Sequence, residues 1–130
     1  SVVIMQGLVQ KVLHVSDMAS EDVLFQRGIL AHSMYYVSSG ELAYIRPGED
    51  PAWVKKDDWM CEMCLWVQWG CRGNCQARED CQIINIDSRK LEEVMAEDEE
   101  LLVLVSLYAE AFCNWLCERK GDDLVDVCFA

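Results

Sequence analysis

Short apolar runs separated by turn-forming residues are the feature that most constrains how this chain can fold. They fill residues 22–87, and they are rich in the β-branched and aromatic side chains that favour strands. Residues 34–37 and 41–45 are joined by Ser38-Ser39-Gly40, which predicts a hairpin. The expected strands are residues 23–25, 34–37, 41–45, 52–54, 74–77 and 81–86. Strands this short and this frequent are typical of a β-sandwich or jelly roll.

Helical periodicity flanks the strands on both sides. Apolar residues at the start recur at helical spacing and predict an amphipathic helix over residues 2–15. After the strands, Asp87 or Ser88 can cap one helix, and Asp98 opens a longer one that Gly121 ends. We therefore expect one α+β domain over residues 1–130, a β-roll (jelly roll) with a short helical insert. Its parts are an N-terminal helix at 2–15, the β-roll at 22–87 and two C-terminal helices at 88–120.

The charge of the chain excludes several classes of partner. The 130 residues carry a net charge of −12, with a pI near 4.4. Nucleic acid and anionic membrane surfaces both need a basic face, so neither is an expected partner. The most apolar segment, residues 101–107, is too short to span a membrane, so no membrane insertion is expected. Because the chain starts at Ser1 and shows no secretory signal, we expect a cytoplasmic piece of a larger protein.

Eight cysteines without a secretory signal indicate a reducing compartment. Cys61-x2-Cys64 followed by Cys71-x3-Cys75 leaves a small zinc site open. The segment around them is apolar, however, and cysteine is often buried as an ordinary core residue. Buried thiols and no metal are the favoured interpretation.

One polar pair stands out within the apolar stretch at residues 57–74. Glu62 is a lone acidic side chain in an apolar run, and Arg72 is a lone basic one between Gly70 and Gly73. A glycine-flanked turn with a guanidinium can bind a phosphate, and a carboxylate can accept from a sugar hydroxyl. The alternative is that Glu62 caps a short helix and Arg72 is a solvated turn residue.

The last helix has an unusually wide apolar surface. Leu101, Val105, Tyr108, Phe112 and Trp115 form one stripe at helical spacing. Packing on the sandwich is the simpler interpretation. A ligand, an intramolecular partner or a second copy of the chain held through Phe112 and Trp115 is the alternative.

Catalytic machinery is not indicated. The chain has two histidines, His14 and His32, and no nucleophile paired with a base. We therefore expect that the protein is not an enzyme.

Four segments, taken in order, resemble the cyclic nucleotide-binding domain family. Its opening strands, F-x-x-G and then Y-x-V-x-x-G-x-(aliphatic), resemble residues 22–28 (DVLFQRG) and 34–45 (MYYVSSGELAYI). Its phosphate-binding cassette, D-x-F-G-E-(aliphatic)-A-L, resembles residues 58–65 (DWMCEMCL). Its closing strand pair resembles residues 77–87 (AREDCQIINID). The likeness covers nearly the whole chain.

This resemblance implies a ligand-gated regulatory module that senses cyclic AMP or cyclic GMP and needs no other cofactor. In the family, the cassette glutamate binds the ribose 2′-hydroxyl, an arginine binds the cyclic phosphate, and the terminal helix closes over the base. Backbone amides at the start of the short cassette helix add to the anion site. Glu62 matches the family glutamate. The ligand-binding residues implied are Glu62, Arg72, Met60, Cys61, Met63, Cys64, Gly73 and Asn74.

Two positions depart from the family pattern. Met60-Cys61 replaces the F-G pair before the glutamate. Counting back from Ala77 places Cys71 at the phosphate arginine, and a one-residue shift in the turn would restore Arg72 to that role. Without this arginine the site would lose a charge-assisted contact of about 1.5–3 kcal/mol. The domain would then be a degenerate module for protein–protein interaction or assembly, its pocket partly filled by Trp59, Trp66 and Trp69.

The parent protein is suggested by the form of the cassette. Its W-x-x-E-x-x-L-W pattern at residues 59–66 resembles divergent channel-type domains, which implies an ion channel such as a potassium channel. The domain would then lie on the cytosolic face of a membrane. A kinase regulatory subunit is the alternative parent.

Overall fold

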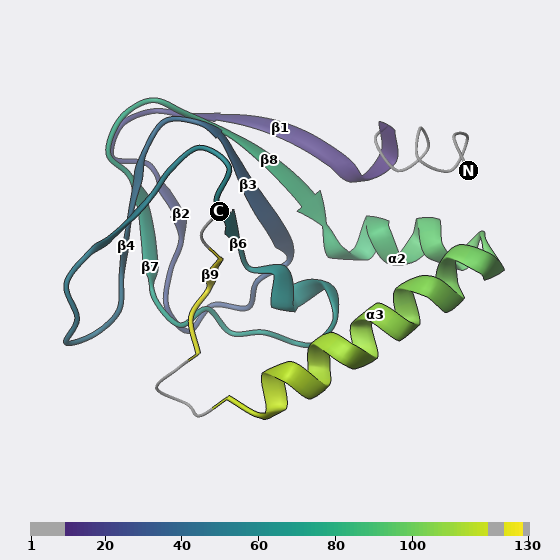
Figure 1. Cartoon of the computed structure of the whole chain (residues 1–130). Helices are drawn as coiled ribbons and strands as arrows, with labels where there is room; N and C mark the ends of the chain where they lie inside the picture. The colour runs from purple at the N-terminus through teal and green to yellow at the C-terminus, as the bar shows by residue number, and fades with distance from the viewer. Residues whose placement is uncertain (1–9, 120–123, 129–130) are drawn as a thin grey trace.

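The protein folds into two antiparallel sheets with helices at one end (Figure 1). The computed structural model describes residues 10–119 and 124–128. The strands are β1 (Leu13–Met18), β2 (Val23–Phe25), β3 (Ser33–Ser39), β4 (Leu42–Ile45), β5 (Ala52–Val54), β6 (Trp59–Met60), β7 (Asn74–Ala77), β8 (Cys81–Asp87) and β9 (Val127–Cys128). The helices are the 3₁₀ turn η1 (Glu62–Leu65), α2 (Ser88–Ala96) and α3 (Glu99–Cys117). The expected α+β β-roll with a short cassette helix and two C-terminal helices is confirmed.

The two sheets face each other across one apolar core. One sheet has five strands in the order β1-β8-β3-β6-β9, and the other has four in the order β2-β7-β4-β5. Val37, Leu42, Val54 and Ile83 are fully buried between them. Because strand side chains alternate between faces, a strand contributes every second residue to this core. The predicted strands at 23–25, 52–54 and 74–77 match β2, β5 and β7, and the other three agree within two residues.

The expected N-terminal helix is wrong at its end. Residues 10–12 are helical, but Leu13–Met18 form β1, and residues 1–9 lie outside the described residues. The β1 strand pairs antiparallel with β8, from Leu13 opposite Ile86 to Met18 opposite Cys81. The pairing of β1 with β8 therefore outweighs the helical spacing of the apolar residues. The β-roll begins at residue 13 rather than 22.

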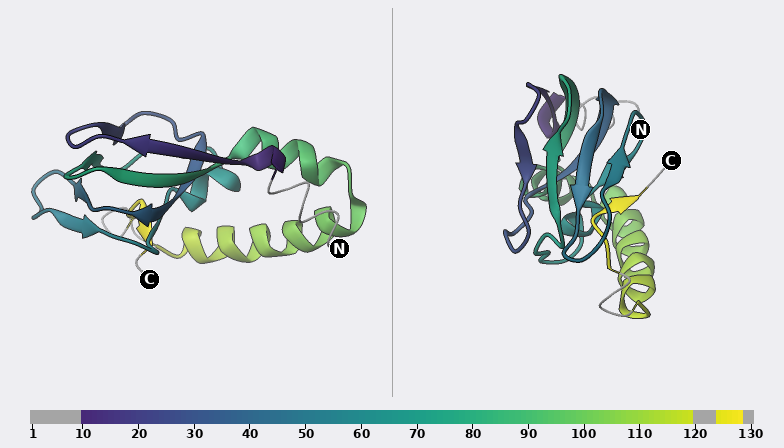
Figure 2. Two further views of the ribbon diagram at one scale, coloured as in Figure 1. Left: turned by 90° about the horizontal axis from the view of Figure 1, so that it is seen from above. Right: turned by 90° about the vertical axis from the view of Figure 1, so that its left-hand side faces the viewer.

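The two C-terminal helices begin at the predicted caps. The Asp87 carboxylate accepts the Lys90 N–H, and the Asp98 carboxylate accepts the Leu101 N–H. Within the described residues α3 ends at Cys117, and the predicted stop at Gly121 lies outside them. Figure 2 shows both helices at the same end of the roll, with α3 running past the sheets.

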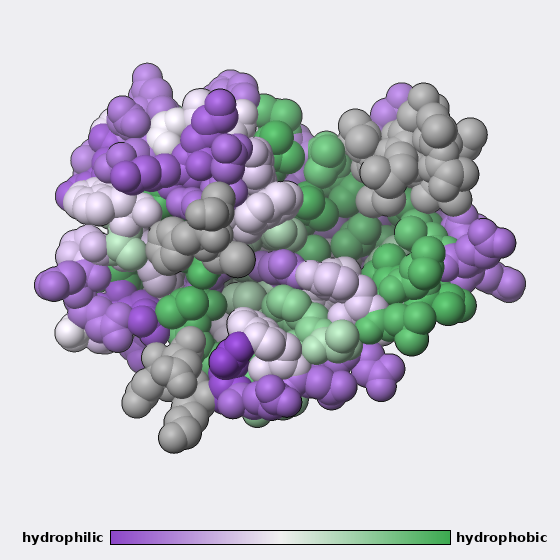
Figure 3. All heavy atoms as spheres, viewed as in Figure 1, coloured by the Kyte–Doolittle hydropathy of each residue, from purple (hydrophilic) through white to green (hydrophobic). Residues whose placement is uncertain are grey.

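The apolar surface of α3 is only partly used. Phe112 and Leu116 pack against a buried cluster of Met63, Cys64 and Trp69, but no residue of the helix is itself buried. Leu104 and Leu107 are 66% and 61% exposed, and hydrophobic side chains gather over this helix in Figure 3. With 19 residues and a mean hydropathy of 1.4, α3 is long and apolar enough to cross a membrane by length and composition alone. The contacts of Phe112 and Leu116 with the buried cluster dock α3 on the roll.

Gly40 in the β3–β4 turn gives a direct test of the hairpin. Its φ is +92°, and a Cβ there would lie 2.6 Å from the Asp80 carbonyl oxygen. We expect Gly40→Ala to lower the free energy of unfolding by about 3 kcal/mol, since strain and a backbone clash add. Gly28→Ala is the control, because φ is +86° there but the space is open. It should cost only about 1 kcal/mol in urea unfolding. Equal losses for the two variants would contradict the close packing of this turn.

Candidate functional site

The cassette is a strand, a tight bend and one short helical turn. β6 ends at Met60, Cys61 bends the chain, and η1 begins at Glu62. The φ of Cys61 is +64°, in the left-handed region that glycine favours. Cys61 stands where the family pattern has glycine, so the backbone keeps the bend although the residue has changed. The left-handed bend costs about 1 kcal/mol for a residue with a side chain.

The Asp126 carboxylate is the centre of the site. Its side chain is 2% exposed, and donors converge on it from three segments. Oδ1 accepts the Trp69 indole N–H at 2.7 Å, and Oδ2 accepts the Tyr44 hydroxyl at 2.7 Å. The Arg72 amide lies 2.9 Å from Oδ2 and 3.1 Å from Oδ1, and the Gly73 amide donates to Oδ2 at 3.0 Å. Two consecutive amides aimed at one anion form a backbone anion site.

The backbone around Asp126 also joins the segment to the cassette. The Cys61 N–H donates to the Asp126 carbonyl oxygen at 2.8 Å. β9 pairs with β6, with Met60 opposite Val127, and the Val127 side chain enters the core. The C-terminal segment therefore holds both the start of η1 and the turn that follows it.

Tyr44 presents a protonated hydroxyl to this carboxylate. Burial raises the pKa of Tyr44, and its hydrogen bond to Asp126 raises it further. The phenol thus stays a donor at any physiological pH. Its oxygen also accepts the Asp126 N–H at 3.3 Å.

Gly73 allows the turn to lie against β4. A Cβ at Gly73 would lie 2.7 Å from the Ile45 carbonyl oxygen and 2.8 Å from the Tyr44 ring. No side chain fits between the turn and β4. The glycine is therefore required if its amide is to reach Asp126.

Glu62 is engaged by the last helix. Its Oε2 accepts the Tyr108 hydroxyl of α3 at 2.8 Å and the Trp66 indole N–H at 3.3 Å. The Trp66 and Tyr108 rings also contact each other, with centroids 5.3 Å apart. The carboxylate that the resemblance assigns to a ribose hydroxyl therefore holds α3 on the cassette.

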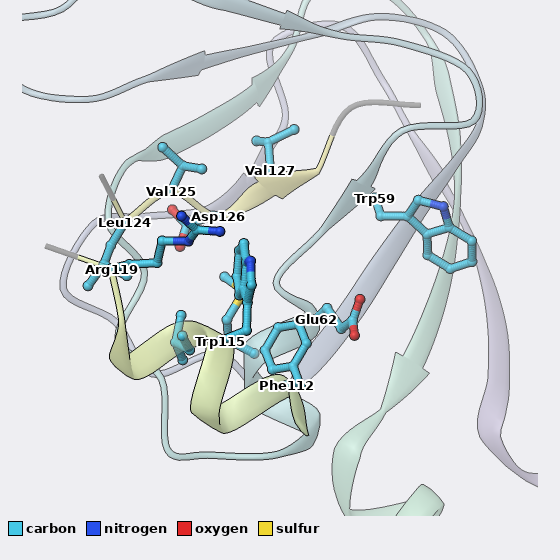
Figure 4. A pocket seen from close by; sticks show the side chains of 11 residues that line it. Trp59, Glu62, Phe112, Trp115, Arg119, Leu124, Val125, Asp126 and Val127 are labelled. Atoms are coloured by element: carbon cyan, nitrogen blue, oxygen red, sulfur yellow. The ribbon is translucent and has the colours of Figure 1, made fainter. Parts of the chain in front are cut away.

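A small cavity remains between these two contacts. Its volume is about 140 Å³, and it is lined mainly by apolar side chains of α3, β9 and the cassette. Figure 4 shows Phe112 and Trp115 of α3 facing the segment that carries Asp126 and Val127. The Arg119 guanidinium covers the Trp115 ring at 4.2 Å from its centroid. Pockets for small-molecule ligands usually measure about 300 Å³ or more, so this space is small for a nucleotide.

The predicted site residues fall into three groups. Glu62, Cys61 and Gly73 lie at the site described above. Arg72 contributes its backbone amide, its side chain is exposed, and a role for its guanidinium in phosphate binding stays a prediction. The others serve packing or the turn: Met60, Met63 and Cys64 are buried, and the Asn74 side chain accepts the Arg27 N–H.

Burial sets the protonation state of two cysteines, Cys64 and Cys75. Burial raises the pKa of both Cys64 and Cys75 to about 12, so these thiols stay protonated. Cys61 lies beside Cys71, and their hydrogen bond, together with burial, raises the pKa of Cys61. The hydrogen bond thus joins one cysteine of Cys61-x2-Cys64 to one of Cys71-x3-Cys75.

Sequence reasoning missed four residues of the site, Asp126, Tyr44, Trp69 and Tyr108. Trp69 was expected only as a pocket filler, and Tyr108 only as part of an apolar stripe. Asp126 lies in a short apolar segment, residues 124–127, that follows the predicted end of the last helix. An acidic residue between valines after a helix was the available signal, but its partners lie more than 50 residues away.

Comparison with known proteins places this geometry among related domains. A family model described as the cyclic nucleotide-binding domain matches residues 16–98, which leaves α3 and β9 outside the match. A search of curated protein sequences finds no match.

Solved structures share the fold at low sequence identity. The C-linker/CNBHD of zELK channels, crystallized in the presence of cAMP, is similar with a TM-score of 0.70 at 21% identity, covering 78% of this chain and 53% of that one. The sensor domain of the transcriptional regulator DNR from Pseudomonas aeruginosa gives 0.67 at 17%, covering 95% and 81%. The N-terminal domain of a transcriptional regulator from Streptomyces coelicolor A3(2) gives 0.71 at 15%, covering 95% and 90%. The chain spans about half the length of the channel fragments.

Removing the Asp126 carboxylate should destabilise the domain strongly. Asp126→Ala leaves buried donors of Tyr44, Trp69 and Gly73 without an acceptor, and we expect a loss of about 3–5 kcal/mol. Tyr44→Phe removes one donor and should cost about 1–2 kcal/mol. Chemical unfolding of each variant measures these losses.

Asp17→Ala is the control for this series, because Asp17 is an exposed aspartate of β1. It should change the free energy of unfolding by less than about 0.5 kcal/mol. If Asp126→Ala were as mild as Asp17→Ala, the network around Asp126 would not hold β9 in solution.

Proposed function

Because the chain belongs to the cyclic nucleotide-binding domain family, we propose that it is a regulatory module of that family whose ligand site is occupied by its own C-terminal segment. Domains of this family are in general regulatory and non-catalytic. One observation carries the proposal: the Asp126 carboxylate takes the consecutive amides of Arg72 and Gly73. β9 thereby acts as an internal ligand.

The two polar positions that a cyclic nucleotide would need are already taken. A phosphate at the Arg72 and Gly73 amides would have to displace Asp126, since both are anions and the space holds one. A ribose hydroxyl at Glu62 would have to displace the Tyr108 hydroxyl. Displacing Asp126 costs buried or part-buried hydrogen bonds to a charged group, about 1.5–3 kcal/mol each. The Glu62–Tyr108 bond is exposed to solvent and costs less.

Tethering and charge both favour the internal ligand. Asp126 is linked to α3 by a short segment, so its effective concentration at the site is about millimolar or higher. A free nucleotide at micromolar concentration competes poorly against this. The net charge of −12 also repels a cyclic phosphate from the domain.

Regulation would work through release of the C-terminal segment. β9 and α3 both contact the cassette, so undocking one loosens the hold on the other. A ligand or partner shifts this equilibrium only by its difference in affinity for the docked and released states. The exposed leucines of α3, Leu104 and Leu107, are where a neighbouring domain or a second copy would sense the change.

The proposed setting is a larger protein, with an ion channel as the first candidate parent and the domain on the cytosolic side of the membrane. Support comes from the fold shared with the zELK channel fragments, of which this chain covers about half. The same fold occurs in transcriptional regulators, so the parent rests on analogy. A kinase regulatory module is the alternative parent.

A direct sensor of cyclic AMP or cyclic GMP is the second candidate function. The observation that favours it is Glu62, which matches the family glutamate and lines the remaining cavity. Such a sensor would need β9 to yield its place to the phosphate, with the Arg72 guanidinium turned inward.

Calorimetry with cyclic AMP and cyclic GMP separates the two functions. We expect no binding by the unmodified chain up to about 1 mM nucleotide, given the effective concentration of the tethered carboxylate. Asp126→Ala should raise the affinity at least about tenfold, because the charge-assisted amide contacts become available to phosphate. Tyr108→Phe, which removes one of the two donors to Glu62 without touching the core, should give a smaller gain.

Asp17→Ala is the control for the nucleotide titration. Asp17→Ala lowers the acidic charge by the same amount as Asp126→Ala and should leave binding unchanged. Micromolar binding by the unmodified chain, lost in Arg72→Ala, would overturn self-occupancy and establish a sensor.

A further inference from the structure

Three ligand atoms from distant parts of the chain meet beside the cassette. They are the sulfurs of Cys61 and Cys71 and a carboxylate oxygen of Asp126, and all lie within 4.8 Å of one another. All three residues are buried, at 0%, 4% and 2% exposure. We propose that Cys61, Cys71 and Asp126 form a binding site for a thiophilic divalent cation, Zn²⁺, that joins the segment before β9 to the cassette bend at Cys61 and to the later turn at Cys71.

The spacing of these atoms suits zinc coordination. In a tetrahedral site with Zn–S of 2.3 Å and Zn–O near 2.0 Å, neighbouring ligand atoms stand about 3.5–3.8 Å apart. The three atoms here lie within 4.8 Å of one another, so small side-chain movements bring them onto one ion. Three protein ligands leave the fourth position for water, as in open zinc sites.

Oδ1 is the Asp126 oxygen with fewer hydrogen bonds and is the one that would bind the metal. Each carboxylate oxygen can accept about two hydrogen bonds. Oδ2 accepts from Tyr44, from Gly73 and from the Arg72 amide at 2.9 Å, while Oδ1 accepts from Trp69 and shares the Arg72 amide at 3.1 Å. A cation on Oδ1 would take the place of this longer, shared contact, and the Arg72 amide would keep its shorter contact with Oδ2.

The donor set and the charge of the chain select the kind of ion. Two sulfurs and one oxygen suit zinc, whereas magnesium and calcium take oxygen ligands. The net charge of −12, which repels a cyclic phosphate, attracts a cation. The positive ion would also offset three buried acidic groups, provided that both thiols give up their protons on binding.

The other cysteines are not part of this group in the described part of the chain. Cys64 and Cys75 are buried nearby but lie outside the three-atom cluster. Cys81 is buried with its thiol against the Glu41 and Glu79 carbonyl oxygens. Cys113 and Cys117 stand one helical turn apart on α3 and are more accessible, so they are the main source of unrelated metal binding.

A metal titration of the reduced 130-residue chain tests the site. The background carries Cys113→Ser and Cys117→Ser, and the protein is stripped of metal with a chelator and desalted. Zn²⁺ is added against a chromogenic competitor, and Co²⁺ is added separately for its visible spectrum. We expect one equivalent of Zn²⁺, and a Co²⁺ spectrum with thiolate charge transfer and tetrahedral d–d bands.

Variants assign the ligands. Cys61→Ser and Cys71→Ser should each weaken Zn²⁺ binding at least a hundredfold, and Asp126→Asn at least tenfold. Cys81→Ser is the matched control, a buried cysteine outside the cluster, and should bind as the background does. Circular dichroism confirms that each variant is folded before titration. Zn²⁺ should raise the melting temperature of the background, reversed by chelator, and not that of Cys71→Ser.

Three results would overturn the site. These are no stoichiometric Zn²⁺, equal affinity in Cys61→Ser and the background, or an octahedral Co²⁺ spectrum without thiolate bands. A Cys61–Cys71 disulfide found by mass spectrometry in the reduced preparation would also overturn it. These experiments measure metal binding only. The proposed function is tested separately, by the nucleotide titration.

Discussion

The buried carboxylate of Asp126, almost completely withdrawn from water, holds the candidate site of this domain together. A buried charge is tolerated only where donors converge on it, and Asp126 receives them from Tyr44 of β4, from Trp69 and from the turn at Arg72 and Gly73. Each donor fixes a different part of the roll. The position of β9, the shape of the turn and the packing of Gly73 against β4 therefore depend on one another.

Because of this constraint, groups of the same chain occupy the polar positions of the family fold. The cassette supplies an anion site and a carboxylate, and the C-terminal part of the same chain supplies an anion and a hydroxyl that fill them. A module of this kind is closed by its own C-terminal segment and does not need a small external anion. Under the proposed function, its resting state is closed and regulation acts by release of the C-terminal segment. Zinc at Cys61, Cys71 and Asp126 would strengthen the closed state, because it joins the same segments that the carboxylate joins.

The parts of the structure that depend on local sequence could be predicted, and those that depend on distant pairing could not. The hairpin around Gly40, the strands at 23–25 and 52–54 and the caps at Asp87 and Asp98 each have a signal within a few residues. β1 was mistaken for helix because its partner, β8, lies about 70 residues away. β9 has two residues, too few for any periodicity. The cassette pattern predicted Glu62 and Gly73 as ligand-binding residues, a role that stays a prediction, whereas Asp126 accepts from donors that no sequence motif connects to it.

Hydrogen exchange at the Arg72 and Gly73 amides and at the Trp69 indole N–H tests the central claim most directly. If the Asp126 carboxylate occupies the site in solution, these three protons exchange slowly in the unmodified chain without any ligand. Their protection should approach that of amides in the β3–β8 ladder. Rapid exchange at these three sites in a folded chain, as in an open turn, would contradict self-occupancy and leave the site free for an external ligand.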